Sequence, residues 1–161
     1  MNGTHRSIRN DRTGRGGPTA LALAVSLALG SASSAWALPT GGVVSAGSAG
    51  IVEGAGKMTV NQSSPNAAIN WQSFSIGQAE AVRFVQPGTS SVALNRVLGA
   101  DPSSILGSLS ANGKVFLVNP NGILFGQGAQ VNVAGLIAST LNISDGDFMS
   151  GKHQFLSLIH I

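Results

Sequence analysis

Short apolar runs separated by polar corners dominate residues 58–143. In residues 81–86, Val82 and Phe84 lie on one face and Arg83 on the other, which is the period of a half-buried β-strand. Asn, Gly, Ser and Pro recur between the runs and indicate turns. No long amphipathic helix separates them, as a sheet built from βαβ units would require. The pattern predicts an all-β chain with strands in residues 58–62, 68–76, 81–86, 91–97, 115–118, 123–125 and 131–133, shorter apolar pairs at 136–137 and 141–143, and a loop or weak edge strand in residues 40–50.

Strands this short, joined by Asn and Gly corners, are typical of a parallel β-helix, in which each coil stacks on the coil before it. A β-sandwich is the alternative, although it usually has longer strands and clearer hairpin turns.

Two segments depart from the simple strand pattern. The apolar phase changes between Trp71 and Phe74, which predicts a bulge or bend near Ser73. We expect both aromatic rings to lie in the core rather than to form a sugar-stacking platform. In residues 101–110, Asp101 can cap a helix whose first position is Pro102, so we expect a single helical turn there, with an irregular loop as the alternative.

The N-terminal segment has the layout of a secretory signal. A basic stretch ends near Arg15, an apolar run covers residues 20–29, and an A-x-A site is formed by Ala35 and Ala37. We expect a signal peptide over residues 1–37 with cleavage after Ala37. A membrane anchor is less favoured, because the apolar run is much shorter than the roughly 20 residues that a spanning helix needs.

Charge and cysteine content restrict the possible partners of the protein and the sources of its stability. The net charge of +3 comes from the basic residues of the N-terminal segment, and the remainder of the chain is balanced. We therefore expect no nucleic-acid partner, because such a partner needs basic residues clustered on the folded part. The chain has no cysteine, so its stability must come from packing and backbone pairing.

The sharpest turn signal is Asn119-Pro120-Asn121-Gly122, between two apolar strands. Asn119 can hydrogen-bond the backbone two residues on, Pro120 presets φ, and Gly122 closes the turn, which is the type I pattern. Turn chemistry alone does not indicate a function.

The segment around this turn resembles a known family. Residues 112–144, "NGKVFLVNPNGILFGQGAQVNVAGLIASTLNIS", are similar to the hallmark region of the two-partner secretion domain at the N-terminus of filamentous haemagglutinin-type exoproteins. Three further segments resemble the same family in the same order: "INWQSFSIG" (69–77), "VRFVQP" (82–87) and "ALNRV" (93–97). The N-terminal residues 1–14 resemble its extended signal region but lack the usual aromatic residues. The family's Asn-Pro-Asn-Leu motif is absent, and residues 92–97 look closer to the adhesin branch that lacks it.

The resemblance implies a right-handed parallel β-helix with an N-terminal cap, occupying residues 38–150. It implies export by the general secretory machinery with signal peptidase, then recognition in the periplasm by an outer-membrane β-barrel transporter carrying POTRA domains. The product would be secreted or held on the surface of a Gram-negative bacterium. No cofactor is implied. The family motif needed for secretion maps onto Asn119, Pro120, Asn121, Gly122 and Ile123, and a structural role at the corner is favoured over direct transporter contact.

Other functions have less support from the residues. A β-helix lyase or hydrolase needs clustered carboxylates, and only Asp145 and Asp147 are close in sequence, which indicates a solvated turn more than a Ca²⁺ site. His153 and His160 have no evident catalytic partner, so we expect no enzyme activity. A single-chain autotransporter passenger would carry its own C-terminal barrel.

The last residues, 151–161, form a tail with no recognisable cap, so we expect a β-helix cut short of a longer exoprotein. Residues 156–161 also look like the translation of a sequencing adaptor. Contacts with host or bacterial surfaces would belong to downstream regions.

Overall fold

The structure, a computed structural model, describes residues 37–156. Most of the predicted signal peptide, including Ala35, and residues 157–161 with His160 lie outside the described residues. Within the described part, no helix is long and apolar enough to cross a membrane.

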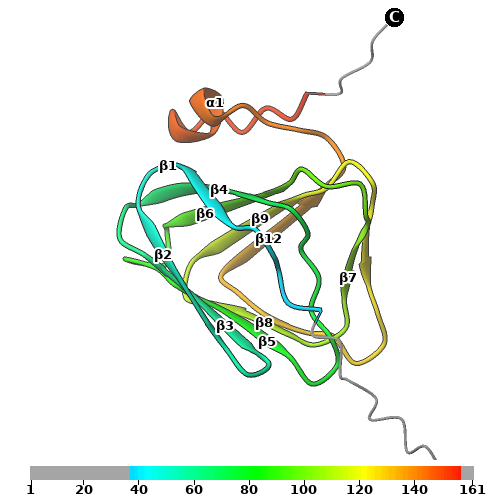
Figure 1. The fold of residues 1–161 in the computed structure, drawn as a ribbon. Coiled ribbons are helices and arrows are strands. Elements are labelled where there is room, and N and C mark those ends of the chain that lie inside the picture. The colour runs from blue at the N-terminus through cyan, green and yellow to red at the C-terminus, as the bar shows by residue number, and fades with distance from the viewer. Residues whose placement is uncertain (1–36, 157–161) are drawn as a thin grey trace, which may run out of the picture. The chain divides into compact units, whose positions relative to one another are not determined.

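Parallel strands from successive coils stack into three sheets around a common core (Figure 1). The predicted parallel β-helix is confirmed, with about four coils. One sheet contains β3 (Lys57–Gln62), β5 (Ala81–Val85), β8 (Ser108–Ala111) and β11 (Gln130–Asn132). The second contains β4 (Asn66–Trp71), β6 (Val92–Val97), β9 (Lys114–Val118) and β12 (Gly135–Ser139), and the third contains β7 (Ser103–Ile105) and β10 (Ile123–Phe125).

These strands define the coils. The first coil contains β3 and β4, the second β5, β6 and β7, the third β8, β9 and β10, and the fourth β11 and β12.

Two antiparallel strands cap the N-terminal side of the stack. β1 (Val43–Ala46) pairs with β4 and β2 (Ala49–Gly54) pairs with β3, so the segment predicted as a loop or weak edge strand forms strands. Gly47 joins them with φ of 75°, and a Cβ there would lie 2.2 Å from the carbonyl oxygen of Asn66. The turn therefore requires glycine.

The helical turn predicted for residues 101–110 is wrong. The segment forms β7 and β8, and its buried Ile105 and Leu109 pair in register with strands of the adjacent coils. Ile105 ends β7 and Leu109 lies in β8, with a corner at residues 106–107 between them, so their helix-like spacing does not belong to a single element. Here the neighbouring coils supply a complete set of backbone partners, and this tertiary context outweighs the local helix signal.

The phase change near Ser73 is a corner between sheets. β4 ends at Trp71, Ser73 bridges Thr40, and Ile76 bridges Ile105 of the next coil. Trp71 and Phe74 both lie in the core, with their rings edge to face at a centroid distance of 5.6 Å. The core inside the coils contains Met58, Val60, Ile69, Trp71, Phe74, Ile76, Val82, Phe84, Ala93, Val97, Ile105, Leu109, Val115 and Leu117.

A second apolar cluster lies on the outer face of the β4–β6–β9 sheet. It contains Ala68, Val92, Leu94, Phe116 and Val118 from the sheet, with Ile143 and Phe148 from the segment that follows β12. We call this segment, residues 140–156, the strap. Figure 1 shows its helix α1 (Asp145–Met149) lying over the sheet's outer side.

The predicted solvated turn at Asp145 and Asp147 is instead the first turn of α1. Ser144 caps the helix: its Oγ accepts a hydrogen bond from Asp147 N (3.1 Å). Both carboxylates stand at the helix N-terminus, where negative charge is favourable. The strap closes on itself through a bond from Leu156 N to Asn142 O (2.7 Å).

Candidate functional site

The candidate secretion motif forms a tight corner between β9 and β10. Gly122 N donates to Asn119 O (3.0 Å), which closes the four-residue turn that the sequence predicts. Asn119 Oδ1 accepts from Asn121 N (2.9 Å), so the side chain itself holds the turn. Gly122 has φ of 110°, a region that side chains disfavour.

Asn119 is fully buried and links three coils. Its Nδ2 donates to Asp101 O (3.0 Å) and to Ser103 Oγ (2.9 Å) in the second coil. Its backbone N–H donates to Ser139 O (3.0 Å) in the fourth coil. The amide thus satisfies polar groups at a corner where the strands have ended. In the folded domain this side chain is not accessible to a partner.

The rest of the motif is oriented differently. Pro120 and Asn121 are exposed, and Asn121 Nδ2 donates to Gly99 O (2.8 Å) across the corner. Gly122 O accepts from Ser103 N (2.9 Å), and half-buried Ile123 packs against the interior core. The motif therefore has one inward amide and an exposed outer tip.

A second polar corner was not predicted from the sequence. Gln62, Gln86 and Asn112 each follow or end a strand of the same sheet, in successive coils. Gln86 Nε2 donates to Gln62 Oε1 (3.2 Å), and Asn112 exchanges two bonds with the backbone of Gln86 (both 2.7 Å). The amide residues after "VN", "FV" and "SA" are the signal that could have revealed this ladder.

A further buried amide lies inside the coils. Asn95 Oδ1 accepts from the indole N–H of Trp71 (2.9 Å), and its Nδ2 donates to Phe116 O (3.3 Å). Throughout residues 37–156, every buried side-chain nitrogen or oxygen has a hydrogen-bond partner. The internal amides are thus explained by the architecture itself.

Arg96 holds the one ion pair of the described residues, with Asp145 at 2.8 Å. Burial of Asp145 would raise its pKa. The neighbouring Ser45 hydroxyl and the Arg96 guanidinium outweigh this effect and lower the pKa below the ordinary value of 3.8.

The remaining candidate residues do not converge. Asp147 Oδ2 accepts a hydrogen bond from the Ser144 hydroxyl (2.6 Å), and His153 packs edge-on against the ring of Phe116 at a centroid distance of 4.9 Å. Ala37, at the predicted cleavage site, donates its N–H to Glu80 Oε1 (2.8 Å). Across the part of the chain that the structure describes, no three His, Asp or Glu side chains are placed to share a metal ion.

A capped stack of short parallel coils, with amide side chains at several of its corners, defines a β-helical domain. The sequence model of the TPS secretion domain family matches residues 35–159, so the chain belongs to the two-partner secretion (TPS) domain family.

Relatives from Haemophilus influenzae agree with this assignment. The chain is 50% identical over 106 residues to the heme/hemopexin-binding protein of strain ATCC 51907 / DSM 11121 / KW20 / Rd, covering 66% of this chain and 12% of the relative. A second heme/hemopexin-binding protein of this species is 50% identical over 101 residues, covering 63% of this chain and 11% of the relative. The crystal structure of the HMW1 secretion domain is 39% identical with a TM-score of 0.67, covering 70% of this chain and 30% of that one.

These comparisons confirm the family resemblance seen in the sequence and the right-handed, capped β-helix that it implies. The domain is a secretion domain of the kind found in TPS exoproteins. The chain corresponds to a small part of the curated relatives' length.

Proposed function

We propose that this domain directs a larger exoprotein to an outer-membrane β-barrel transporter with POTRA domains and then starts the folding of its β-helix. The match of the TPS secretion domain model across residues 35–159 carries the proposal. The role is one of targeting and folding rather than catalysis. The protein would be secreted, or displayed on the surface of a Gram-negative cell, after passing through the periplasm.

Recognition in the periplasm would involve the unfolded chain. The chain has no cysteine, so no disulfide can lock it before transport. Its short strand segments carry unpaired backbone groups until the coils stack. Such segments can add to the edge strands of POTRA domains by β-augmentation.

Folding outside the cell would proceed in one direction. β1 and β2 cover one side of the stack, whereas β10, β11 and β12 each pair with a single strand within residues 37–156. In stacked repeats each coil gains stability from its nearest neighbours. Coils emerging later would therefore stack on the β10–β12 side, and this gain in free energy would draw the chain outward without ATP.

The secretion motif would act mainly by building its corner. Asn119 connects the second, third and fourth coils through hydrogen bonds, and its side chain is buried in the folded domain. Both observations support a structural role. Pro120 and Asn121 are the exposed residues of the motif. A transporter that contacts the folded corner would contact these two residues.

The test is secretion of the tagged full chain by a Gram-negative host with and without its transporter gene. We expect transporter-dependent appearance in the medium, with Leu38 as the first residue of the processed form. Secretion without the transporter would favour an autotransporter-like route and contradict the proposal.

Two single variants distinguish the roles of the corner. Asn119→Ala should reduce both the stability of the folded domain and its secretion. Asn121→Ala should have little effect on either. Loss of secretion in Asn121→Ala with unchanged stability would instead indicate direct contact with the transporter.

A further inference from the structure

The outer face of the β4–β6–β9 sheet carries an apolar row that the fold must cover. In register across the strands, Ala68, Leu94, Phe116 and Ile137 occupy one row on this face. Ala68, Leu94 and Phe116 come from the first three coils and half-buried Ile137 continues the row into the fourth, so the row exists only when the coils are stacked in register. Left open, it would expose a continuous apolar surface.

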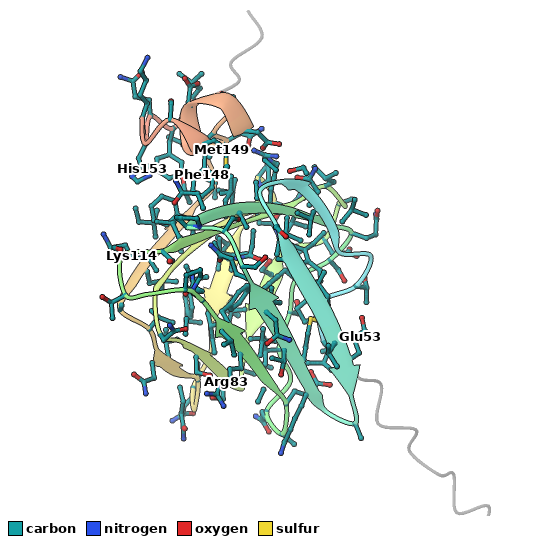
Figure 2. All side chains as sticks on the ribbon, turned by 90° about the vertical axis from the view of Figure 1, so that its left-hand side faces the viewer. Glu53, Arg83, Lys114, Phe148, Met149 and His153 are labelled. Carbon is teal, nitrogen blue, oxygen red and sulfur yellow. The ribbon has the colours of Figure 1, made fainter. Side chains whose placement is uncertain are left out.

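The strap covers this row with two buried side chains. Ile143 is 1% exposed and Phe148 is fully buried. The ring of Phe148 meets that of Phe116 edge-on at a centroid distance of 6.0 Å. Figure 2 shows His153 close to Phe148 of α1, and the two rings stack at a centroid distance of 6.0 Å.

Arg96 joins the strap to two coils at once. From β6 in the second coil, its Nη1 donates to Asn70 Oδ1 in the first coil (2.9 Å). Its Nε donates to Asn142 Oδ1 (2.8 Å), and its Nη2 donates to the carbonyl of Ile143 and to Asp145 Oδ1 (2.8 Å). The guanidinium has this geometry only when β4 and β6 are paired and the strap is seated.

The strap is fixed to the coils by side chains alone. Among the described residues, each backbone-to-backbone hydrogen bond made by residues 140–156 has its partner within the same segment. The strap can therefore lift away without breaking any strand ladder. Segments held in this way open at lower free energy than the core.

We propose that the strap is a latch that closes only over the first three coils stacked in register. Ile143 and Phe148 have a complete apolar surface to pack on only when β4, β6 and β9 are aligned. Arg96 likewise has all its hydrogen-bond acceptors only when β4 and β6 are paired and the strap is in place. Closure is then the last step in folding this part of the stack, and opening is a local event that exposes the apolar row while the coils stay folded. This latch is a property of the fold and does not depend on the proposed transport.

Hydrogen exchange and hydrophobic-dye binding of the refolded full chain test the latch. Phe148→Ala should lower exchange protection of residues 141–156 at least tenfold and increase dye fluorescence several-fold, with the protection of β3, β5 and β6 unchanged. Met149→Ala is the matched control, because this neighbouring side chain is 37% exposed. Loss of protection throughout the coils, an equal effect of Met149→Ala, or an unchanged strap would each overturn the proposal.

Two further measurements address the dependence on the coils. Asn70→Ala removes a contact of the first coil and should open the strap without altering any strap residue. In pulse-labelled refolding, the strap should gain protection after β4, β6 and β9. An unaffected strap in Asn70→Ala, or strap protection that appears together with or before β4, would contradict the latch. Asp145→Asn serves as a milder opening variant should Phe148→Ala not fold, and it must lower strap protection selectively.

Discussion

At the scale of single residues, Asn119 shows how one buried amide can hold a corner of the fold. One amide closes its own turn, satisfies Asp101 O and Ser103 Oγ, and is fully buried. Removal of a buried partner leaves the other group unsatisfied, which costs more than the net value of the hydrogen bond. The candidate secretion motif therefore holds a corner of the fold.

Asn119→Ala should lower the free energy of unfolding by about 2–3 kcal/mol, because Asp101 O and Ser103 Oγ lose a buried donor. Asn119→Asp should be equally harmful, since a carboxylate cannot donate to a carbonyl. The measurement is urea unfolding followed by far-UV circular dichroism. Asn121→Ala is the control and should cost about 0.5–1 kcal/mol, because its bond to Gly99 O lies at the surface. Equal losses in the two variants would contradict the structural role of Asn119.

At the scale of elements, a strand with one buried face could be predicted from its alternating sequence. For a strand that is buried on both faces, the strand itself could be predicted but the element that covers its outer face was not. β5 alternates buried and exposed residues, and the sequence shows this directly. β9 is buried at four consecutive positions, because one face meets the core and the other meets the strap. Such runs are typical of strands covered on both faces. The run "VFLV" (115–118) therefore indicates an element that covers the outer face of the sheet.

Three missed elements, β7, β8 and α1, depend on partners distant in sequence. β7 and β8 carry a local helix signal and become strands because neighbouring coils supply their ladders. α1 is short, and it is stabilised by Phe148 in the outer cluster and by Arg96, which lies far upstream in the chain. The four-residue turn of the motif was predictable because its hydrogen bonds are local. Its contacts with Asp101, Ser103 and Ser139 were not.

The docking of the strap on the sheet should weaken at acidic pH. The pKa of Asp145 is lower in the folded state than its ordinary value of 3.8, so its ionised form stabilises the docked strap above that pH. This stabilisation should be lost as the pH falls through the lower folded pKa. Hydrophobic-dye fluorescence should therefore rise below about pH 4, before the far-UV signal of the coils changes.

Other titratable groups also lie on this side of the molecule, namely Asp147 in α1 and His153 later in the strap, and Arg96 pairs with Asp145. Asp145→Asn isolates the contribution of one carboxylate. Its dye fluorescence should be higher at neutral pH and should change less on acidification. A variant with the same acid response as the parent protein would show that another group controls docking.

At the scale of the whole molecule, stability should be distributed unevenly along the stack. The first coil is paired on both sides, by the cap and by the second coil, whereas β11 of the fourth coil pairs only with β8 in the described part. Val60 of β3 is fully buried, and Val131 of β11 is 39% exposed. In a stack whose coils are stabilised by their nearest neighbours, a defect in one coil also destabilises the coils that pair with it.

Val60→Asp should therefore prevent folding of the whole domain, because an unpaired carboxylate would be buried in the first coil. Val131→Asp introduces the same change at an exposed edge and should loosen only the fourth coil. Hydrogen exchange would show global loss of protection in the first variant and loss confined to β11 and β12 in the second. If folding on the outer surface draws the chain outward, Val60→Asp should also secrete far more slowly than Val131→Asp at equal periplasmic levels. Equal secretion rates for two variants that differ this much in folding would mean that transport is driven by something other than the stacking of coils.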